Sequence, residues 1–139
     1  APKIDLELLD GRKLTNESLK GKVVVIQFTA SWCGVCIKEM PHLEKEVWLP
    51  FKDEGLMLIG IDRDEPLEVV KKFKKQTGIT YPLALDPGAN HFSKFAHKNA
   101  GVTRNVVIDK KGNIAFLTRL SDKDEFEAMK QKIKLLLGE

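Results

Sequence analysis

The chain contains two cysteines, Cys33 and Cys36, in the segment WCGVC at residues 32–36. An apolar run at residues 23–28 lies just before this segment. A disulfide between residues three apart closes a small ring, which removes little entropy from the unfolded chain and makes a poor structural staple. The pair is therefore predicted to form and break its disulfide during function, which is redox chemistry.

Cys33 is expected in the first turn of a helix. The run 23–28 is apolar and β-branched, which favours a buried strand of a parallel sheet, and residues 33–51 carry apolar side chains at helical spacing. Free amide groups and the positive end of the helix dipole favour a thiolate there, so the pKa of Cys33 should fall. Cys33 is predicted to attack and Cys36 to resolve the mixed disulfide. Helical residues three apart sit slightly too far apart for a relaxed disulfide, so a small local adjustment is expected.

Length and composition indicate one globular domain. The chain has 139 residues, of which 42% are hydrophobic and 31% charged, with a net charge of +3. A chain of this length buries enough surface to need no staple or metal. No apolar run approaches the roughly 20 residues needed to cross a bilayer, and the N-terminus lacks a signal-peptide pattern, so the chain as given is expected to be soluble.

The densest basic stretch, residues 71–75, does not have the pattern of a nucleic-acid site. It lies in a segment with an apolar stripe at helical spacing, and it lacks the clustered arginines or stacking aromatics that nucleic-acid binding requires. We interpret it as the solvated face of a helix.

Strands and helices alternate along the chain. Strands are predicted at 4–9, 12–14, 23–28, 56–62, 81–85, 105–109 and 113–119, and helices at 33–51, 67–76, 90–97 and 122–137. The first two strands form a hairpin around an Asp-Gly turn, and the last two form another. This order predicts an α/β fold with a mixed central sheet covered by other elements on both faces.

The segment FTASWCGVC at residues 28–36, with Pro41 five residues beyond Cys36, resembles the active-site segment of thioredoxins. The N-terminal hairpin, the inserted helix–strand unit at about 66–85, and the Gly-Val pair before VIDKKG at 107–112 resemble the TlpA/ResA branch. The resemblance implies a single thioredoxin-like domain over residues 1–139 and a thiol-disulfide oxidoreductase of the protein-disulfide reductase type.

The resemblance also implies partners and location. The substrates would be protein thiols and disulfides, electrons would come from an upstream redox protein, and no bound cofactor, stable metal or nucleic acid is implied. The location would be periplasmic or otherwise extracytoplasmic in a bacterium. Membrane contact would use a segment absent from this chain, and a cytoplasmic location is left open.

Glu39 is the third candidate catalytic residue. It lies three residues after Cys36, at a position where ResA-like proteins carry a carboxylate. Near a partly buried thiol its pKa should rise, which would let it accept the proton of Cys36. The alternative is a surface glutamate beside Lys38. Gln27, where thioredoxins place a buried aspartate, cannot titrate.

Four residues are assigned to substrate contact: Trp32, Gly34, Val35 and Thr103. Trp32 is expected to form an apolar docking surface. Thr103 occupies the position of the family's cis-proline, where a cis bond without proline costs about 2.5–4 kcal/mol, so the loop is either strained or trans. Val35 replaces the proline between the cysteines of thioredoxin, which should shift the redox potential in a direction that one residue does not define. Arg104 would either favour the Cys33 thiolate, bind an acidic partner, or simply lie on the surface.

Three other functions remain as alternatives. A peroxidase on the same fold is disfavoured because Ile26 and Ala30 stand where the peroxiredoxin signature has proline and threonine. A metal carrier would need Cys33, Cys36 and a histidine such as His42, yet one cysteine pair supplies only half a zinc site. His91 and His97 flank a predicted helix. A scaffold that uses only the surface near Trp32 is disfavoured by the intact cysteine pair.

Overall fold

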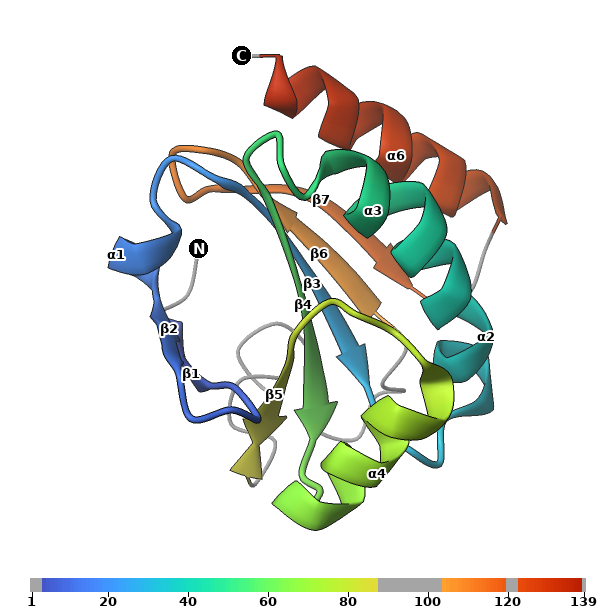
Figure 1. The fold of residues 1–139 in the computed structure, drawn as a ribbon. Helices are drawn as coiled ribbons and strands as arrows, with labels where there is room; N and C mark the ends of the chain where they lie inside the picture. Colours follow the sequence, from blue (N-terminus) through green and yellow to red (C-terminus); the bar gives the residue numbers. More distant parts are fainter. Residues whose placement is uncertain (1–3, 88–103, 120–122, 139) are drawn as a thin grey trace.

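The computed structural model describes residues 4–87, 104–119 and 123–138 (Figure 1). Its centre is a five-stranded mixed sheet with the strand order β5-β4-β3-β6-β7. The strands are β3 (Val23–Thr29), β4 (Leu56–Arg63), β5 (Leu83–Asp86), β6 (Arg104–Ile108) and β7 (Ile114–Arg119). Strands β3, β4 and β5 are parallel to one another, β6 is antiparallel to β3, and β7 is antiparallel to β6. The predicted α/β fold with a mixed central sheet is confirmed.

The active-site segment leaves the sheet from its central strand. All seven residues of β3 are buried, as expected for an apolar β-branched run with both faces covered. Along this strand side chains alternate between the faces, so Gln27 and Thr29 share a face while Phe28 points to the other. The register aligns Thr29 with Asp62, so these two strands reach the same edge of the sheet together.

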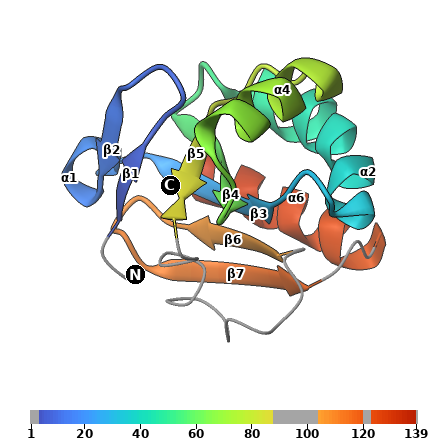
Figure 2. The same cartoon turned by 90° about the horizontal axis from the view of Figure 1, so that it is seen from below.

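The helices that follow β3 in the described part of the chain pack on one face of the sheet. They are α2 (Gly34–Leu43), α3 (Leu49–Phe51), α4 (Leu67–Thr77) and α6 (Lys123–Leu137), with a π-helical turn, η1 (Glu44–Trp48), between α2 and α3. Figure 2 shows α2, α4 and α6 together on this side. Their apolar side chains enclose the main core with β3 and β4, through residues such as Met40, Phe73 and Ile133.

The opposite face is covered, within the described part of the chain, by the N-terminal hairpin. Strands β1 (Asp5–Glu7) and β2 (Lys13–Thr15) pair antiparallel, and α1 (Asn16–Leu19) follows with Thr15 as its cap. Leu6 and Leu19 are buried here against Ile26 and Phe28. The predicted hairpin is confirmed, although its first strand is shorter than the expected 4–9 and its second strand is shifted by one residue from the expected 12–14.

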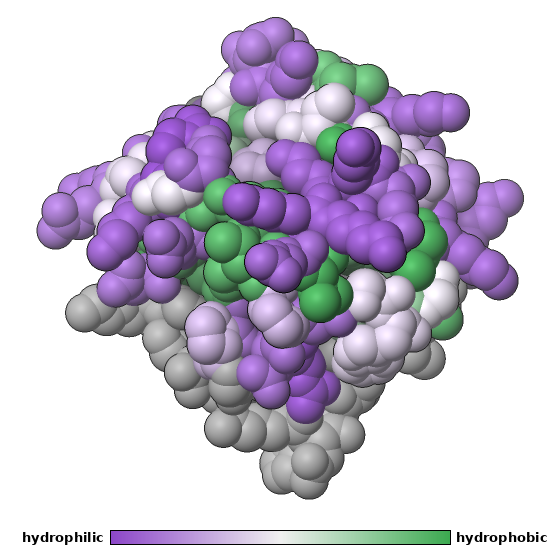
Figure 3. Space-filling model, turned by 60° about the horizontal axis from the view of Figure 1, so that its bottom comes forward, coloured by the Kyte–Doolittle hydropathy of each residue, from purple (hydrophilic) through white to green (hydrophobic). Residues whose placement is uncertain are grey.

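Most other predicted boundaries differ from the structure by one or two residues. The expected helix 33–51 is instead three successive segments, and it contains Pro41 and Pro50, which both lack the amide hydrogen of a regular helical ladder. Strand β5 begins at Leu83 rather than Tyr81. The predicted helix 90–97 lies outside the described residues. None of the described helices has the length and apolar character of a membrane span. The face seen in Figure 3 is mostly hydrophilic, with an apolar patch near its centre.

Position 60 in β4 has no room for a side chain larger than that of glycine. A Cβ atom at this position would collide with the side chain of Leu83 and touch the ring of Tyr81. Overpacking of a core costs about 1–3 kcal/mol, so Gly60→Ala should lower the free energy of unfolding by that amount in denaturant titrations of the oxidised protein. Gly34→Ala is the matched control, because a Cβ there meets nothing within 4 Å. Equal stability of the two variants would contradict this packing.

Candidate active site

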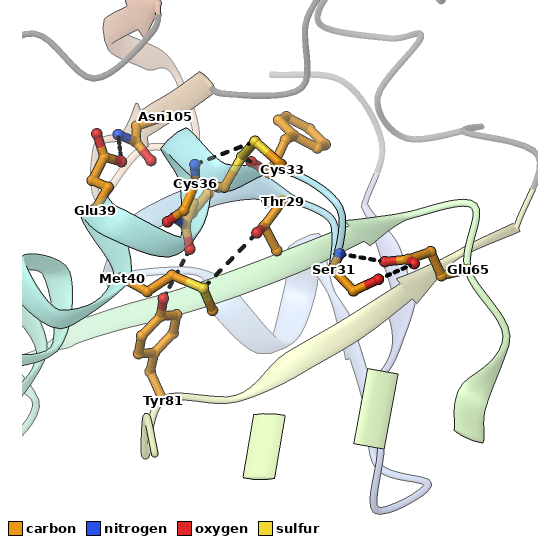
Figure 4. Close-up of a disulfide and its surroundings, with 11 residues drawn as sticks. Thr29, Ser31, Cys33, Cys36, Glu39, Met40, Glu65, Tyr81 and Asn105 are labelled. Atoms are coloured by element: carbon orange, nitrogen blue, oxygen red, sulfur yellow. Dashed lines mark hydrogen bonds between the residues drawn. A yellow bond between two sulfur atoms is a disulfide. The ribbon is translucent and has the colours of Figure 1, made fainter. Parts of the chain in front are cut away.

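Cys33 and Cys36 form a disulfide, with their Cα atoms 5.3 Å apart (Figure 4). Cys33 is the N-cap of α2 and has extended backbone angles, φ −91° and ψ 96°, so the prediction that it occupies the first helical turn is wrong by one position. The cap position suits it because an N-cap side chain accepts a hydrogen bond from the third helical amide. Here the Cys36 amide donates to Cys33 Sγ over 3.2 Å.

The two sulfurs differ in access. Cys33 is 8% exposed, whereas Cys36 is fully buried, with its Sγ 3.8 Å from the Phe28 carbonyl oxygen. A substrate disulfide can therefore approach Cys33 and not Cys36. Amide donors at a helix start stabilise a thiolate, and the Cys36 amide already points at Cys33 Sγ.

Two exposed apolar side chains lie close to Cys33 in the sequence. Trp32 is 66% exposed and Val35 is 42% exposed. Gly34 is also exposed, in the first turn of α2. Thr103 and the bond before it lie outside the described residues. Arg104 begins β6, where its backbone pairs with that of Phe28.

Glu39 is buried at 4% exposure, so the alternative of a surface glutamate is wrong. Its Oε1 accepts a hydrogen bond of 2.6 Å from Asn105 Nδ2, which reaches it from β6 (Figure 4). Burial raises the pKa of Glu39 above its usual value, although the Asn105 hydrogen bond and the charge of His42 act in the opposite direction. Glu39 and Cys36 both face inward from α2, one turn apart.

Gln27 is held beneath Cys36 by a tyrosine. The Tyr81 hydroxyl donates to Gln27 Oε1 over 2.8 Å, which orients Gln27 Nε2 towards the Cys36 carbonyl oxygen at 3.5 Å. Burial, with the charges of Glu39 and Glu44, raises the pKa of Tyr81, so its hydroxyl remains a donor. The position of the thioredoxin aspartate therefore carries a fixed neutral amide in this chain.

A pair of carboxyl groups lies next to the cysteine loop. Glu65 accepts hydrogen bonds from the Ser31 amide, at 2.6 Å, and from its hydroxyl, at 2.5 Å (Figure 4). Asp62, at the end of β4, is fully buried. Burial first, and then the neighbouring Glu65 carboxyl, raise the pKa of Asp62 to about 9.

Asp62 should make stability fall as pH rises. A carboxyl whose pKa is higher in the folded state stabilises the fold fully below its unfolded value, near 3.8, and that contribution is lost progressively up to about pH 9. We expect the free energy of unfolding to decline between pH 4 and 9 more steeply for the natural protein than for Asp62→Asn. Denaturant titrations across this range test it, and parallel pH profiles would contradict the assignment.

Four residues of this site were not predicted from the sequence: Asp62, Glu65, Tyr81 and Asn105. Asp62 had a usable signal, because a polar residue that ends an apolar parallel strand lies at the edge where ligand and catalytic groups gather. Tyr81 and Asn105 had none, since they reach Gln27 and Glu39 across 54 and 66 residues of sequence.

Two alternatives rested on particular residues. His42 is exposed on α2 and contacts Glu46 Oε2 at 2.9 Å. His91 and His97 lie outside the described residues, and within the described ranges no three histidine, cysteine or acidic residues are grouped to hold a metal ion. Ile26 and Ala30, which replace the peroxiredoxin proline and threonine, are fully buried apolar side chains.

The mixed sheet, the helix that starts at a cysteine and the CXXC disulfide together define the thioredoxin-like thiol-disulfide class. The family model described as the AhpC/TSA family matches residues 1–117. The chain belongs to this family, and it is a thiol-disulfide oxidoreductase whose redox pair is Cys33 and Cys36.

Individual relatives agree with this assignment. The thiol-disulfide oxidoreductase ResA of Bacillus cereus is 32% identical over 96% of this chain and 76% of its own length. Several other ResA sequences are matched over only 60–64% of their length. A solution structure described as a candidate protein disulfide isomerase from Bacteroides thetaiotaomicron is 57% identical, with a TM-score of 0.96 over 100% of this chain and 88% of that one. A candidate thiol:disulfide interchange protein DsbE from Chlorobium tepidum is 25% identical, with a TM-score of 0.87 over 99% and 95% of the chains.

Proposed function

We propose that this domain reduces disulfides of protein partners, with Cys33 as the attacking and Cys36 as the resolving residue. The observation that carries this assignment is the asymmetry of the pair. Cys33 carries the more accessible sulfur, which accepts a hydrogen bond from the Cys36 amide, whereas Cys36 is fully buried. The sulfur of the less buried cysteine, when it is stabilised as a thiolate, is the one that meets a bulky substrate.

The exchange proceeds in two balanced steps. The Cys33 thiolate attacks one sulfur of the substrate disulfide, which forms a mixed disulfide and releases the other substrate sulfur as a thiolate. The Cys36 thiol then loses its proton and attacks Cys33 Sγ. The second substrate sulfur leaves, and the Cys33–Cys36 disulfide remains. Two electrons pass to the substrate, and a dithiol protein upstream must return them.

Glu39 is proposed to accept the proton of Cys36. It faces inward one turn beyond that residue, and its raised pKa makes it a stronger base than an ordinary glutamate. Asn105 fixes one oxygen of the carboxyl group by its hydrogen bond of 2.6 Å. Gln27 cannot accept the proton of Cys36. Glu39 is therefore the candidate proton acceptor on α2.

Substrate docking is proposed for the apolar surface of Trp32, Gly34 and Val35, with Thr103 as a further contact. Trp32 and Val35 lie within two residues of Cys33 in the sequence and expose a large part of their area. The ResA and DsbE relatives support an extracytoplasmic location, with any membrane contact made by a segment outside this chain.

The function is tested by equilibrating the protein with glutathione or dithiothreitol buffers and trapping free thiols by alkylation. We expect the Cys33–Cys36 disulfide to form and break reversibly, with a potential in the reductase range, near the value of about −270 mV of thioredoxin. A potential far above the glutathione range would contradict a reductase, and the absence of a reversible intramolecular disulfide would contradict the function altogether.

A further inference from the structure

Asp62 is a buried carboxyl group that takes no part in the proposed disulfide exchange. It lies at the end of β4, opposite Thr29 in the register, and alternation places it on the face of the sheet that α2 covers. Neither of its carboxyl oxygens accepts a hydrogen bond from any of the described residues. A buried polar group of this kind is rare in a folded protein and calls for a functional explanation.

Glu65, three residues further on, ties the loop after β4 to the loop that carries Cys33. Its two oxygens each accept one hydrogen bond from Ser31, one from the amide and one from the hydroxyl. Ser31 lies two residues before Cys33, and the Cys33 amide donates to the Ala30 carbonyl oxygen over 3.1 Å. Glu65 therefore fixes the turn that presents Cys33 as the cap of α2.

The two carboxyl groups act on each other in opposite directions. Burial and the adjacent Glu65 raise the pKa of Asp62, so Asp62 is protonated at neutral pH. Burial opposes ionisation of Glu65, but hydrogen bonding with Asp62 and with Ser31 outweighs it and lowers the pKa of Glu65. The pair thus holds one proton on Asp62 and one negative charge on Glu65.

Other charged groups near this pair are few. Asp86 ends the neighbouring strand β5, but alternation places its side chain on the opposite face of the sheet. From α2 the groups on the Asp62 side are the cysteines and the buried Glu39, and from the start of α4 they are the exposed Glu68 and Lys71. None of these groups shifts the pKa of Asp62; among the described residues the one charged group that does so is Glu65.

We propose that Glu65 is a positioning residue for Cys33, and that a proton on Asp62 holds the Glu65 carboxylate in place. This inference rests on the proposed role of Cys33 and deepens it. The protonated Asp62 side chain supplies a hydrogen-bond donor to Glu65, Glu65 accepts from Ser31, and the Ser31 turn keeps Cys33 Sγ over the first amides of α2. Loss of the Asp62 proton would place two carboxylates together and loosen this arrangement.

The test measures the rate at which iodoacetamide alkylates Cys33 between pH 5 and 10.5. The Cys36→Ser background leaves Cys33 as the only thiol. Glu65→Ala should raise the apparent pKa of Cys33 and slow its alkylation at pH 7 about tenfold, as expected when one hydrogen bond to a charged sulfur is lost. Glu65→Gln keeps the shape and one acceptor, and should restore most of the rate.

Asp62→Asn is the matched variant for the proton, because its amide is a neutral donor at every pH. It should alkylate at the parent rate at pH 7, and it should lack the fall in rate near pH 9 that we expect of the parent when Asp62 ionises. Ser31→Ala, which removes only one of the two hydrogen bonds to Glu65, should give a smaller decrease than Glu65→Ala and serves if that variant fails to fold.

The outcomes separate the possible explanations. If Glu65→Ala and Ser31→Ala both keep the parent profile, Glu65 does not position Cys33. If Glu65→Ala and Glu65→Gln both accelerate alkylation, only the negative charge matters, and the positioning role is again overturned. If Asp62→Asn retains the change near pH 9, Asp62 is not its source. An unreactive Cys33 in the parent itself would instead overturn the proposed function.

Discussion

Replacement of Cys33 by serine is expected to abolish disulfide exchange, because the accessible nucleophile is lost and the buried Cys36 cannot reach a bulky substrate. Turnover of a disulfide-bonded protein with dithiothreitol as the electron source should fall to the uncatalysed rate. The serine differs from cysteine by one atom at the cap of α2, and serine is itself a good N-cap, so the fold should persist.

Cys36→Ser is the matched counterpart. This variant keeps the attacking sulfur and loses the resolving one, so it should accumulate a covalent mixed disulfide with its substrate, visible on a non-reducing gel and absent after reduction. Cys33→Ser should trap nothing. Equal turnover in the Cys33→Ser variant and the natural protein, or trapping through Cys36 alone, would show that the roles of the two sulfurs are misassigned.

Glu39→Gln is expected to slow resolution of the mixed disulfide about 10²-fold at pH 7, the lower end of the range for general-base catalysis. The base acts when ionised, and burial raises the pKa of Glu39. In the natural protein the resolution rate should therefore rise as pH increases through this raised value, whereas the glutamine variant should depend on the ionisation of Cys36 alone. Stopped-flow measurement of product release at several pH values separates these profiles.

Lys38→Gln is the control for this experiment, because Lys38 is the exposed neighbour of Glu39 on the same helix. It removes a charge close to the site without touching the buried carboxyl group, and it should resolve at the natural rate. If Glu39→Gln has no effect on resolution, or if Lys38→Gln has the same effect, then Glu39 does not act as the proton acceptor.

The sequence was sufficient for the parts of the fold that depend on local pattern. The buried strand was predicted at 23–28 from its mostly apolar, β-branched run and extends one residue further, to Thr29, and the hairpin around Gly11 follows from its turn dipeptide. The redox pair could also be predicted from the sequence, because two cysteines three residues apart after such a strand have few other uses. The position of Cys33 was misjudged by one residue, since a cap differs from a first turn only in its backbone angles.

The supporting residues of the site could not be read from the sequence, because each depends on long-range pairing. Asn105 reaches Glu39 only because β6 lies beside β3, and Tyr81 reaches Gln27 across 54 residues of sequence. The burial of Glu39 is a consequence of the same packing. Its position three residues after Cys36 predicted the right side of the helix, but not the asparagine that holds it.

Site-resolved alkylation of the reduced natural protein tests the central assignment most directly. The protein is exposed to iodoacetamide at pH 6 to 9, and the modified cysteine is identified by mass spectrometry of its peptides. We predict that Cys33 is modified at neutral pH while Cys36 stays protected until the protein is denatured. Modification of Cys36 first, or no reaction of either thiol at neutral pH, would contradict the account.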